Sequence, residues 1–401
     1  MQYRRLGNTG CEISALGFGT MRLPTTDHAP GSANIDTQEA IRLIRHAIDQ
    51  GLNYVDTAYN YHGGQSEAVV GEALKDGYRE KTYLATKSPV WLFNEPEDFD
   101  RHLDEQLSKL RTDHIDFYLL HALNHDTWEN KVKKLGLIGR MAAAKAAGKI
   151  RFMGFSFHSS VELFKEIVDA SDDWDFCQIQ YNYMDEHSQA GRKGLHYAAS
   201  KNLPVIIMEP LRGGKLVGLL PEEAKQLMES YRVKRSPAEW AFRWLWNQPE
   251  VTCVLSGMNS LEMVRENVRT ASEARAGELT GDDEELLQNV VKAINARIKV
   301  GCTGCRYCMP CPKNVDIPGT FAAYNRKYTE GFRAALMEYF MCTAVRKDSS
   351  AASNCIECGK CEQHCPQHLE IRRELKNARR ELEGPIYKIG RKMVQWLRLY
   401  G

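Results

Sequence analysis

Two runs of cysteines near the C-terminal end of the chain have spacings that could hold metal. Eight of the 12 cysteines in this 401-residue sequence fall in these runs. The first reads C-x2-C-x2-C-x2-C-P and the second C-x2-C-x2-C-x3-C-P, and their members are Cys302, Cys305, Cys308, Cys311, Cys355, Cys358, Cys361 and Cys365. Thiolates bind zinc and iron–sulfur clusters. The spacing therefore favours metal over a disulfide framework.

The second run resembles the bacterial two-cluster ferredoxin pattern, in which the fourth cysteine of each run binds the cluster of the other run. This resemblance implies two [4Fe-4S] clusters. One would be held by Cys302, Cys305, Cys308 and Cys365, and the other by Cys355, Cys358, Cys361 and Cys311. The alternative is a pair of Zn(Cys)4 sites, although zinc motifs rarely combine consecutive x2 spacings with a Cys-Pro.

A second group of polar residues follows apolar runs in the first third of the chain. Asp56 and Tyr61 lie in "LNYVDTAYNY", Lys87 in "TYLATKS" and His121 in "IDFYLLHAL". A tyrosine has a pKa of about 10, and a neighbouring lysine cation lowers that pKa by stabilising the phenolate. An aspartate would keep the lysine charged, and a histidine could aim a hydrogen bond at a carbonyl oxygen. Such a set would protonate a carbonyl while a hydride arrives at its carbon.

For these residues to act together, the strands that carry them must end at the same place. Between residues 13 and 274, short apolar runs alternate with amphipathic segments of helical length, in eight strand–helix units. Repeated crossover helices imply parallel pairing, and eight units fit a closed α/β (β/α)8 TIM barrel, whose chemistry lies at the C-terminal strand ends. A doubly wound open sheet is the alternative, but the Gly-rich turn that usually follows its first strand is not found here.

The composition changes after the barrel segment. The stretch between the cysteine runs is helical in pattern, and the residues after the second run are helical and basic. The last segment, with Trp396, fits a helix packed on the protein or on a partner, which we favour, or a membrane-surface helix. The expected domains are a barrel at 1–278, a connecting helix at 279–300, a mainly helical 4Fe-4S ferredoxin-type domain at 301–370 and a basic helical tail at 371–401.

The barrel segment resembles the aldo-keto reductase family. "GLNYVDTAYNY" matches the D-T-A-x-x-Y element of that family, "LATK" its lysine strand and "DFYLLH" its histidine strand. The resemblance covers roughly residues 1–275. It implies a catalytic tetrad of Asp56, Tyr61, Lys87 and His121, with Tyr61 as the general acid and base.

The resemblance also implies an extended NAD(P)H across the barrel mouth, without a Rossmann motif. Ser156 and Gln178 would hold the carboxamide, a segment that ends at Lys215 would line the pyrophosphate, and Glu266 and Asn267 would lie near the adenine. The full expected cofactor set is Gly19, Thr20, Asp56, Ser156, Gln178, Met208, Pro210, Leu211, Gly213, Lys215, Gly257, Met258, Asn259, Glu266 and Asn267.

Three departures from the family pattern bear on the cofactor. The usual Asn after the serine is Phe157, and the usual aromatic that stacks on the nicotinamide is Met208. Gly257 and Met263 stand where many relatives have the cations that bind the 2′-phosphate. Charge-assisted hydrogen bonds to that phosphate would be lost. NADP(H) is the family default, and NAD(H) stays open.

Composition excludes several classes of function. A net charge of +1 gives no overall attraction to nucleic acid. The chain has no apolar stretch near the roughly 18 residues that would span a bilayer, and its start "MQYRRLGNTG" lacks a signal-peptide core. We therefore expect a cytoplasmic protein that binds no nucleic acid and has no transmembrane segment.

The resulting hypothesis is an oxidoreductase that reduces a small-molecule carbonyl with NAD(P)H, or oxidises the alcohol, and carries an electron-transfer or structural 4Fe-4S module. The alternative is an iron–sulfur electron-transfer protein whose clusters couple to a redox partner protein, with the barrel as a secondary or inactive binding module. A hydride carries two electrons and a cluster accepts one, and no flavin site is identifiable. Met21, Trp91 and Trp128 are candidates for the substrate wall.

Overall fold

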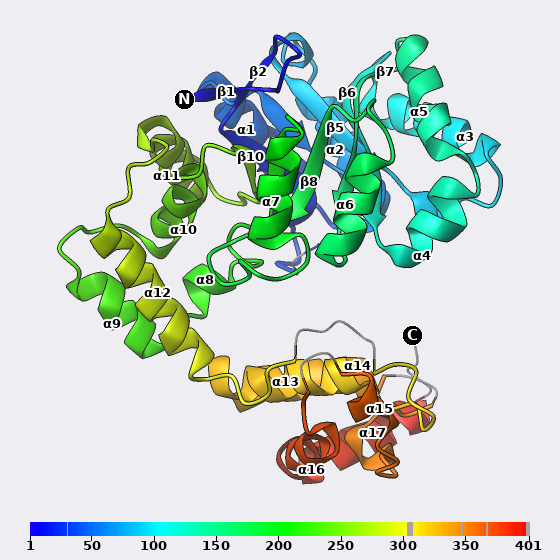
Figure 1. Ribbon diagram of the computed structural model, residues 1–401, viewed down its shortest axis with the longest axis vertical. Coiled ribbons are helices and arrows are strands. Elements are labelled where there is room, and N and C mark those ends of the chain that lie inside the picture. Colours follow the sequence, from blue (N-terminus) through cyan, green and yellow to red (C-terminus); the bar gives the residue numbers. More distant parts are fainter. Residues whose placement is uncertain (30, 303–307, 346–347, 366–367, 398–401) are drawn as a thin grey trace. The chain divides into compact units, whose positions relative to one another are not determined.

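The computed structural model describes residues 1–29, 31–302, 308–345, 348–365 and 368–397. Eight parallel strands form a closed barrel in the order β10-β3-β4-β5-β6-β7-β8-β9 (Figure 1). This confirms the predicted (β/α)8 barrel and excludes the open doubly wound sheet. The strands are β3 (Leu16–Gly19), β4 (Tyr54–Asp56), β5 (Tyr83–Ser88), β6 (Ile115–Leu123), β7 (Ile150–Phe157), β8 (Phe176–Gln180), β9 (Val205–Met208) and β10 (Val251–Ser256).

Amphipathic helices connect the strands and surround the barrel (Figure 1). In α1 (Thr37–Asp49) the side chain of Asp36 caps the first turn, and apolar residues at three- and four-residue spacings, including Leu43 and Ile44, are buried against the sheet. The other crossover helices are α2 (Ser66–Ala73), α3 (Glu97–Leu110), α4 (His125–Thr127), α5 (Leu137–Ala146), α6 (Val161–Asp169), α7 (Gly191–Ser200), α10 (Pro237–Trp246) and α11 (Leu261–Glu273).

An antiparallel hairpin precedes the barrel. Strands β1 (Tyr3–Arg5) and β2 (Glu12–Ser14) pair with each other, and Leu6 and Ile13 are fully buried in one cluster with Phe117 from the first half of β6. The hairpin therefore covers the N-terminal end of the barrel. This leaves the C-terminal strand ends as the face on which a site can be built.

The chain forms two compact units. The first comprises Met1–Leu216 and Arg235–Asp283, and the second comprises Val217–Lys234 and Glu284–Gly401. The part of the second unit between the cysteine runs is helical, as predicted. The remaining helices are α8 (Lys215–Gly218), α9 (Glu222–Ser230), α12 (Gly281–Asn295), α13 (Ile317–Thr329), α14 (Phe332–Thr343), α15 (Lys360–Gln363), α16 (Ile371–Leu382) and α17 (Pro385–Leu397).

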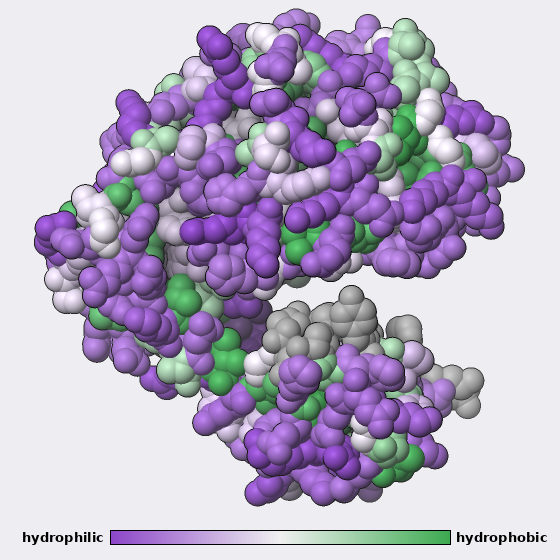
Figure 2. All heavy atoms as spheres, viewed as in Figure 1, coloured by the Kyte–Doolittle hydropathy of each residue, from purple (hydrophilic) through white to green (hydrophobic). Residues whose placement is uncertain are grey.

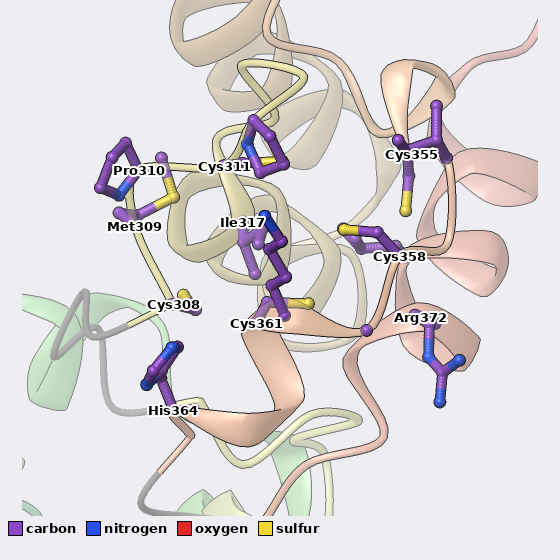
Figure 3. A pocket seen from close by; sticks show the side chains of 15 residues that line it. Cys308, Met309, Pro310, Cys311, Ile317, Cys355, Cys358, Cys361, His364 and Arg372 are labelled. Atoms are coloured by element: carbon purple, nitrogen blue, oxygen red, sulfur yellow. The ribbon is translucent and has the colours of Figure 1, made fainter.

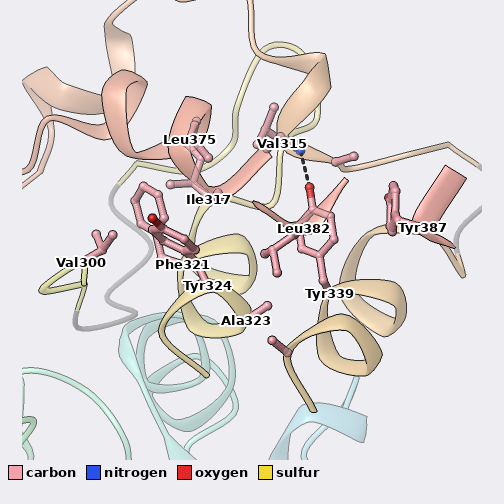
Figure 4. Packing of buried hydrophobic residues seen from close by; sticks show 14 of the residues in the cluster. Val300, Val315, Ile317, Phe321, Ala323, Tyr324, Tyr339, Leu375, Leu382 and Tyr387 are labelled. Atoms are coloured by element: carbon pink, nitrogen blue, oxygen red, sulfur yellow. Dashed lines mark hydrogen bonds between the residues drawn. The ribbon is translucent and has the colours of Figure 1, made fainter. Parts of the chain in front are cut away.

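The second unit has its own hydrophobic core (Figure 4). Phe321 of α13, Tyr339 of α14 and Leu375 of α16 are buried together, and several cysteines of the two runs pack against this cluster. The Tyr339 hydroxyl accepts from the N–H of Ala352 at 2.8 Å and donates to Glu383 at 2.7 Å. The helices therefore form a scaffold that fixes the loop leading into the second cysteine run.

Candidate active site and cysteine cavity

The four residues predicted as a tetrad lie together at the C-terminal face of the barrel. Asp56 is the last residue of β4, Lys87 and His121 lie near the ends of β5 and β6, and Tyr61 begins the 3-10 helix η2 (Tyr61–Gly64). The strands are neighbours in the barrel, with Asp56 opposite Ala85 in register. Parallel pairing thus brings residues up to 65 positions apart in the chain to one place.

Lys87 is the centre of this group. Its Nζ donates to Asp56 Oδ1 at 2.6 Å, to the carbonyl of Thr57 at 2.8 Å and to the Tyr61 hydroxyl at 3.4 Å. The side chains of Lys87 and Asp56 are almost fully buried. Burial opposes the charge of the ammonium, but the Asp56 carboxylate and Tyr61 favour it, and the net effect raises the pKa of Lys87. Lys87 is therefore a cation at neutral pH.

The Tyr61 hydroxyl is held by Lys87 but is not made acidic overall. Burial raises the pKa of Tyr61 above 10, while Lys87 lowers it and Asp56 raises it. The sequence predicted that Lys87 would lower the pKa of Tyr61. Lys87 does lower it, but burial raises it by more. Tyr61 thus carries its proton at neutral pH and can act as a proton donor.

His121 lies in an irregular part of β6. The register with β7 shifts between Leu120 and Leu123, and Ala122 has a left-handed φ of 54°. The N–H of Ala122 donates to Ser156 Oγ at 2.7 Å. Bulges of this kind redirect side chains at active sites. Here the bulge places the His121 ring 6.1 Å from the Tyr61 ring, at an interplanar angle of 77°.

The His121 imidazole is uncharged at neutral pH. Burial, Lys87 and His158 lower its pKa well below the ordinary value. Its Nδ1 is buried and has no hydrogen-bond partner among the described residues. A neutral imidazole next to an ammonium can still donate one N–H to an incoming oxygen.

Ser156 and Gln178, the residues expected to hold a carboxamide, are cross-strand neighbours on β7 and β8. Gln178 Nε2 donates to Asp56 Oδ2 at 3.1 Å, while its Oε1 is buried without a partner among the described residues. Ser156 Oγ accepts from Ala122 and retains its own proton for donation. One buried acceptor and one donor therefore lie on the paired strands β7 and β8, and an amide needs one group of each kind.

The other expected cofactor residues follow the ends of strands β3, β9 and β10 on the same face. Thr20 donates to the Asp56 carbonyl at 3.0 Å, which ties the end of β3 to the tetrad. Glu266 accepts from Ser236 at 2.5 Å, and Asn267 donates to Ser256 at 3.1 Å. The residues of this set that lie in the segments after the strands are Pro210, Leu211, Gly213, Lys215, Gly257, Met258 and Asn259.

Arg22 also lies at this face and is not among the residues predicted from the sequence. A Cβ added to Gly257 would lie 2.9 Å from the Arg22 Cβ, and one added to Gly213 would lie 3.2 Å from an Arg22 guanidinium nitrogen. Arg22 is exposed and has no ion-pair partner among the described residues. Because Gly257 has no side chain, there is room beside it for the Arg22 cation, which comes from the segment after β3. The signal in the sequence that could have identified Arg22 is its position two residues after Thr20.

The candidates for the substrate wall have different environments. The Trp91 ring lies 5.2 Å from the His121 ring, and Met21 is exposed. Trp128, in contrast, is buried, and its Nε1 donates to Glu166 at 2.8 Å. Trp128 therefore belongs to the packing of the loop, and its proposed place in the wall is wrong.

A cavity of about 340 Å³ lies between the two cysteine runs (Figure 3). It is lined by Cys308 and Cys311 of the first run and by Cys355, Cys358 and Cys361 of the second. The four cysteines that the ferredoxin resemblance assigned to one cluster thus line the cavity, but Cys308, which it assigned to the other cluster, lines the same cavity. Cys302 and Cys365 are half-buried, and Cys305 lies outside the described residues.

The cysteines that line the cavity fit the ligands of an iron–sulfur cluster. The 11 described cysteines form no disulfide bonds. The cavity is lined by five of these cysteines, and an iron–sulfur cubane is held by four thiolates.

Comparisons with known proteins match both parts of the chain. The model of the aldo/keto reductase family matches residues 15–279, and that of the 4Fe-4S dicluster domain matches residues 301–369. The "Uncharacterized oxidoreductase YqkF" of Bacillus subtilis is 27% identical, over 73% of this chain and 97% of its own. The "NADH-specific methylglyoxal reductase" of Escherichia coli is 27% identical, over 66% and 91%.

A solved structure agrees with these matches. The holo form of the aldo-keto reductase AKR11C1 from Bacillus halodurans superimposes with a TM-score of 0.61 at 28% identity. The match covers 73% of this chain and 97% of that structure.

Proposed function

Because the chain belongs to the aldo/keto reductase family and carries a 4Fe-4S domain, we propose that it is an NAD(P)H-dependent reductase of small carbonyl compounds. The observation that carries this proposal is the contact of one buried ammonium, Lys87, with both Asp56 and the Tyr61 hydroxyl. A bound dihydronicotinamide would supply the hydride that the carbonyl carbon gains. The carbonyl oxygen gains a proton from Tyr61, and the product is the alcohol.

Each member of the tetrad has a separate task in this reaction. Tyr61 is protonated at neutral pH because burial raises its pKa, so it is ready to donate. Lys87 stabilises the phenolate that remains after proton transfer. Asp56 keeps Lys87 charged and fixes its position. The neutral His121 donates an N–H to the carbonyl oxygen and orients it toward Tyr61.

The residues around the tetrad suit a nicotinamide dinucleotide. The buried, unpartnered Oε1 of Gln178 and the hydroxyl of Ser156 would bind the carboxamide. The guanidinium of Arg22 lies at the segments expected to line the phosphates and would form charge-assisted bonds to them. Since one relative is named as NADH-specific, both dinucleotides are candidates.

The cysteine runs are proposed to hold two [4Fe-4S] clusters. Cys311, Cys355, Cys358 and Cys361 would bind one of them in the cavity of Figure 3. Cys302, Cys305, Cys308 and Cys365 would bind the other. The exposure of Cys358 supports exchange of single electrons with a redox partner protein at that edge.

The replacement Tyr61→Phe tests the reductase proposal. It removes the proton donor but leaves the ring, so we expect carbonyl reduction to fall by about 10²-fold or more, with unchanged binding of the dinucleotide. Anaerobic purification, titration with NADPH and NADH by fluorescence, and turnover of a carbonyl panel provide the measurements. Turnover equal to that of the unaltered protein would contradict the assignment.

A further inference from the structure

The last helix, α17, has one face that packs and one that does not. On the packed face Tyr387 and Val394 are buried. A Cβ added to Gly390 would lie 2.4 Å from a ring carbon of Phe340 in α14, so the two helices are in close contact there. The position of α17 in the second unit is therefore fixed by its own apolar contacts. Its other face does not take part in this packing.

That other face is a continuous apolar stripe. Ile386, Ile389, Met393 and Trp396 are 65%, 61%, 55% and 83% exposed. Their spacings of three, four and three residues place them on one side of a helix. Single exposed apolar residues occur across the surface (Figure 2), but a row of four on one helix marks an interaction site.

The charges next to the stripe are positive. Lys388 and Lys392 are exposed and have no ion-pair partner among the described residues, and α17 contains no Asp or Glu. Lys388 and Lys392 lie on the helix surface between the stripe and the packed face. Residues 371–397, which form α16 and α17, contain eight Lys and Arg against three Asp and Glu.

We propose that α17 binds in the plane of an anionic lipid surface, with the stripe in the apolar layer and the lysines among the headgroups. Such in-plane helices combine an apolar face that carries Trp with Lys on the polar face, and Trp prefers the headgroup level. No helix within the described residues is long and apolar enough to cross a bilayer. This inference does not depend on the reductase proposal.

Flotation of the cluster-loaded full chain with lipid vesicles tests this proposal. Vesicles of phosphatidylglycerol and phosphatidylcholine at about 3:7, and of phosphatidylcholine alone, are compared at low and high salt. We expect binding to the anionic vesicles only, and weaker binding at high salt. The double replacement Ile389→Gln and Trp396→Gln should weaken binding about tenfold or more, because apolar burial drives insertion.

Two further variants test the role of the lysines and the specificity for α17. Lys388→Gln with Lys392→Gln leaves the stripe and the packed face intact, and should abolish the preference for anionic vesicles. Leu219→Gln removes another exposed apolar side chain of the same unit outside α17 and should leave binding unchanged. Iron content checks that each variant is folded.

Two outcomes would overturn the proposal. One is the absence of flotation of the unaltered protein with anionic vesicles. The other is a dimer in sedimentation that the Ile389→Gln and Trp396→Gln variant dissociates, with no lipid binding, which would assign the stripe to a second copy of the chain.

Discussion

Lys87 controls the electrostatics of the barrel site because its ammonium touches both the carboxylate and the phenol. Its Nζ lies 2.6 Å from Asp56 Oδ1 and 3.4 Å from the Tyr61 hydroxyl. Its charge lowers the pKa of Tyr61 against the effect of burial. The rate and the pH dependence of proton transfer should therefore both respond to this residue.

The replacement Lys87→Met should reduce turnover by about 10²-fold or more and shift the pH profile. Without the cation the pKa of Tyr61 rises further, so alcohol oxidation, which needs the phenolate, should require a higher pH than in the unaltered protein. The loss of one partner of a buried pair should also lower the free energy of unfolding by about 3–5 kcal/mol. A pH–rate profile and denaturant unfolding measure these effects, and an unshifted oxidation profile would argue against electrostatic control by Lys87.

Arg22 gives a second prediction at the residue scale. Replacing Arg22 with Gln removes a cation from the proposed phosphate site, so the Kd for NADPH should rise about tenfold or more, as is typical for hydrogen bonds to charged groups. Turnover at saturating cofactor should change little. Fluorescence titration at two salt concentrations measures the effect, since the difference should shrink as salt screens the charge.

Arg42 is a matched control for this experiment. It is exposed on α1 and paired with Glu39 at 2.7 Å, so Arg42→Gln removes the same charge at another place on the barrel. Equal Kd values for the Arg22 and Arg42 variants would show that Arg22 does not bind the phosphates.

At the scale of elements, the bulge in β6 decides where His121 lies. Ala122 adopts φ of 54°, a region that side chains with a branched Cβ disfavour. Ala122→Val should therefore lower the free energy of unfolding by about 1–2 kcal/mol and reduce carbonyl turnover by displacing the imidazole. Ala122→Gly is the control, because glycine accepts this φ and should retain activity. Thermal unfolding and turnover of both variants measure this, and a valine variant with unaltered activity would contradict it.

The sequence predicted the barrel and the meeting of the tetrad because both follow from repeated units. Apolar runs set the strands, and a polar residue after a strand must lie at the C-terminal face. The bulge at Ala122 was not predictable, since one extra residue in β6 is visible only against its partner β7. The burial of Trp128, the position of Arg22 and the net pKa of Tyr61 depend on which neighbours pack around them, and these neighbours are distant in the sequence.

At the scale of the whole molecule, the proposed function joins two redox chemistries in one chain. The barrel is suited to hydride transfer, which moves two electrons together, while each cluster accepts one electron at a time. The two units have separate hydrophobic cores. We therefore expect the barrel reaction to run without the clusters, and the clusters to serve exchange with a partner.

The replacement Cys311→Ala tests this separation together with the assignment of Cys311 as a cluster ligand. Cys311 is in the first run, but it lines the cavity with Cys355, Cys358 and Cys361. Its loss should therefore remove the cluster of the second run, about four iron atoms per chain, while carbonyl turnover persists. Iron and sulfide counts, together with the visible absorbance of the protein, follow the cluster, and an NADPH-dependent assay follows the barrel.

Cys342→Ala is the control, because Cys342 is a half-buried cysteine outside both runs and its loss should leave the iron content unchanged. Full iron content in the Cys311 variant would show that Cys311 binds neither cluster, which contradicts its assignment as a ligand. Loss of carbonyl turnover in a folded Cys311 variant would instead place the clusters within the catalytic circuit. The prediction of independent chemistry is contradicted if carbonyl turnover falls together with the iron content.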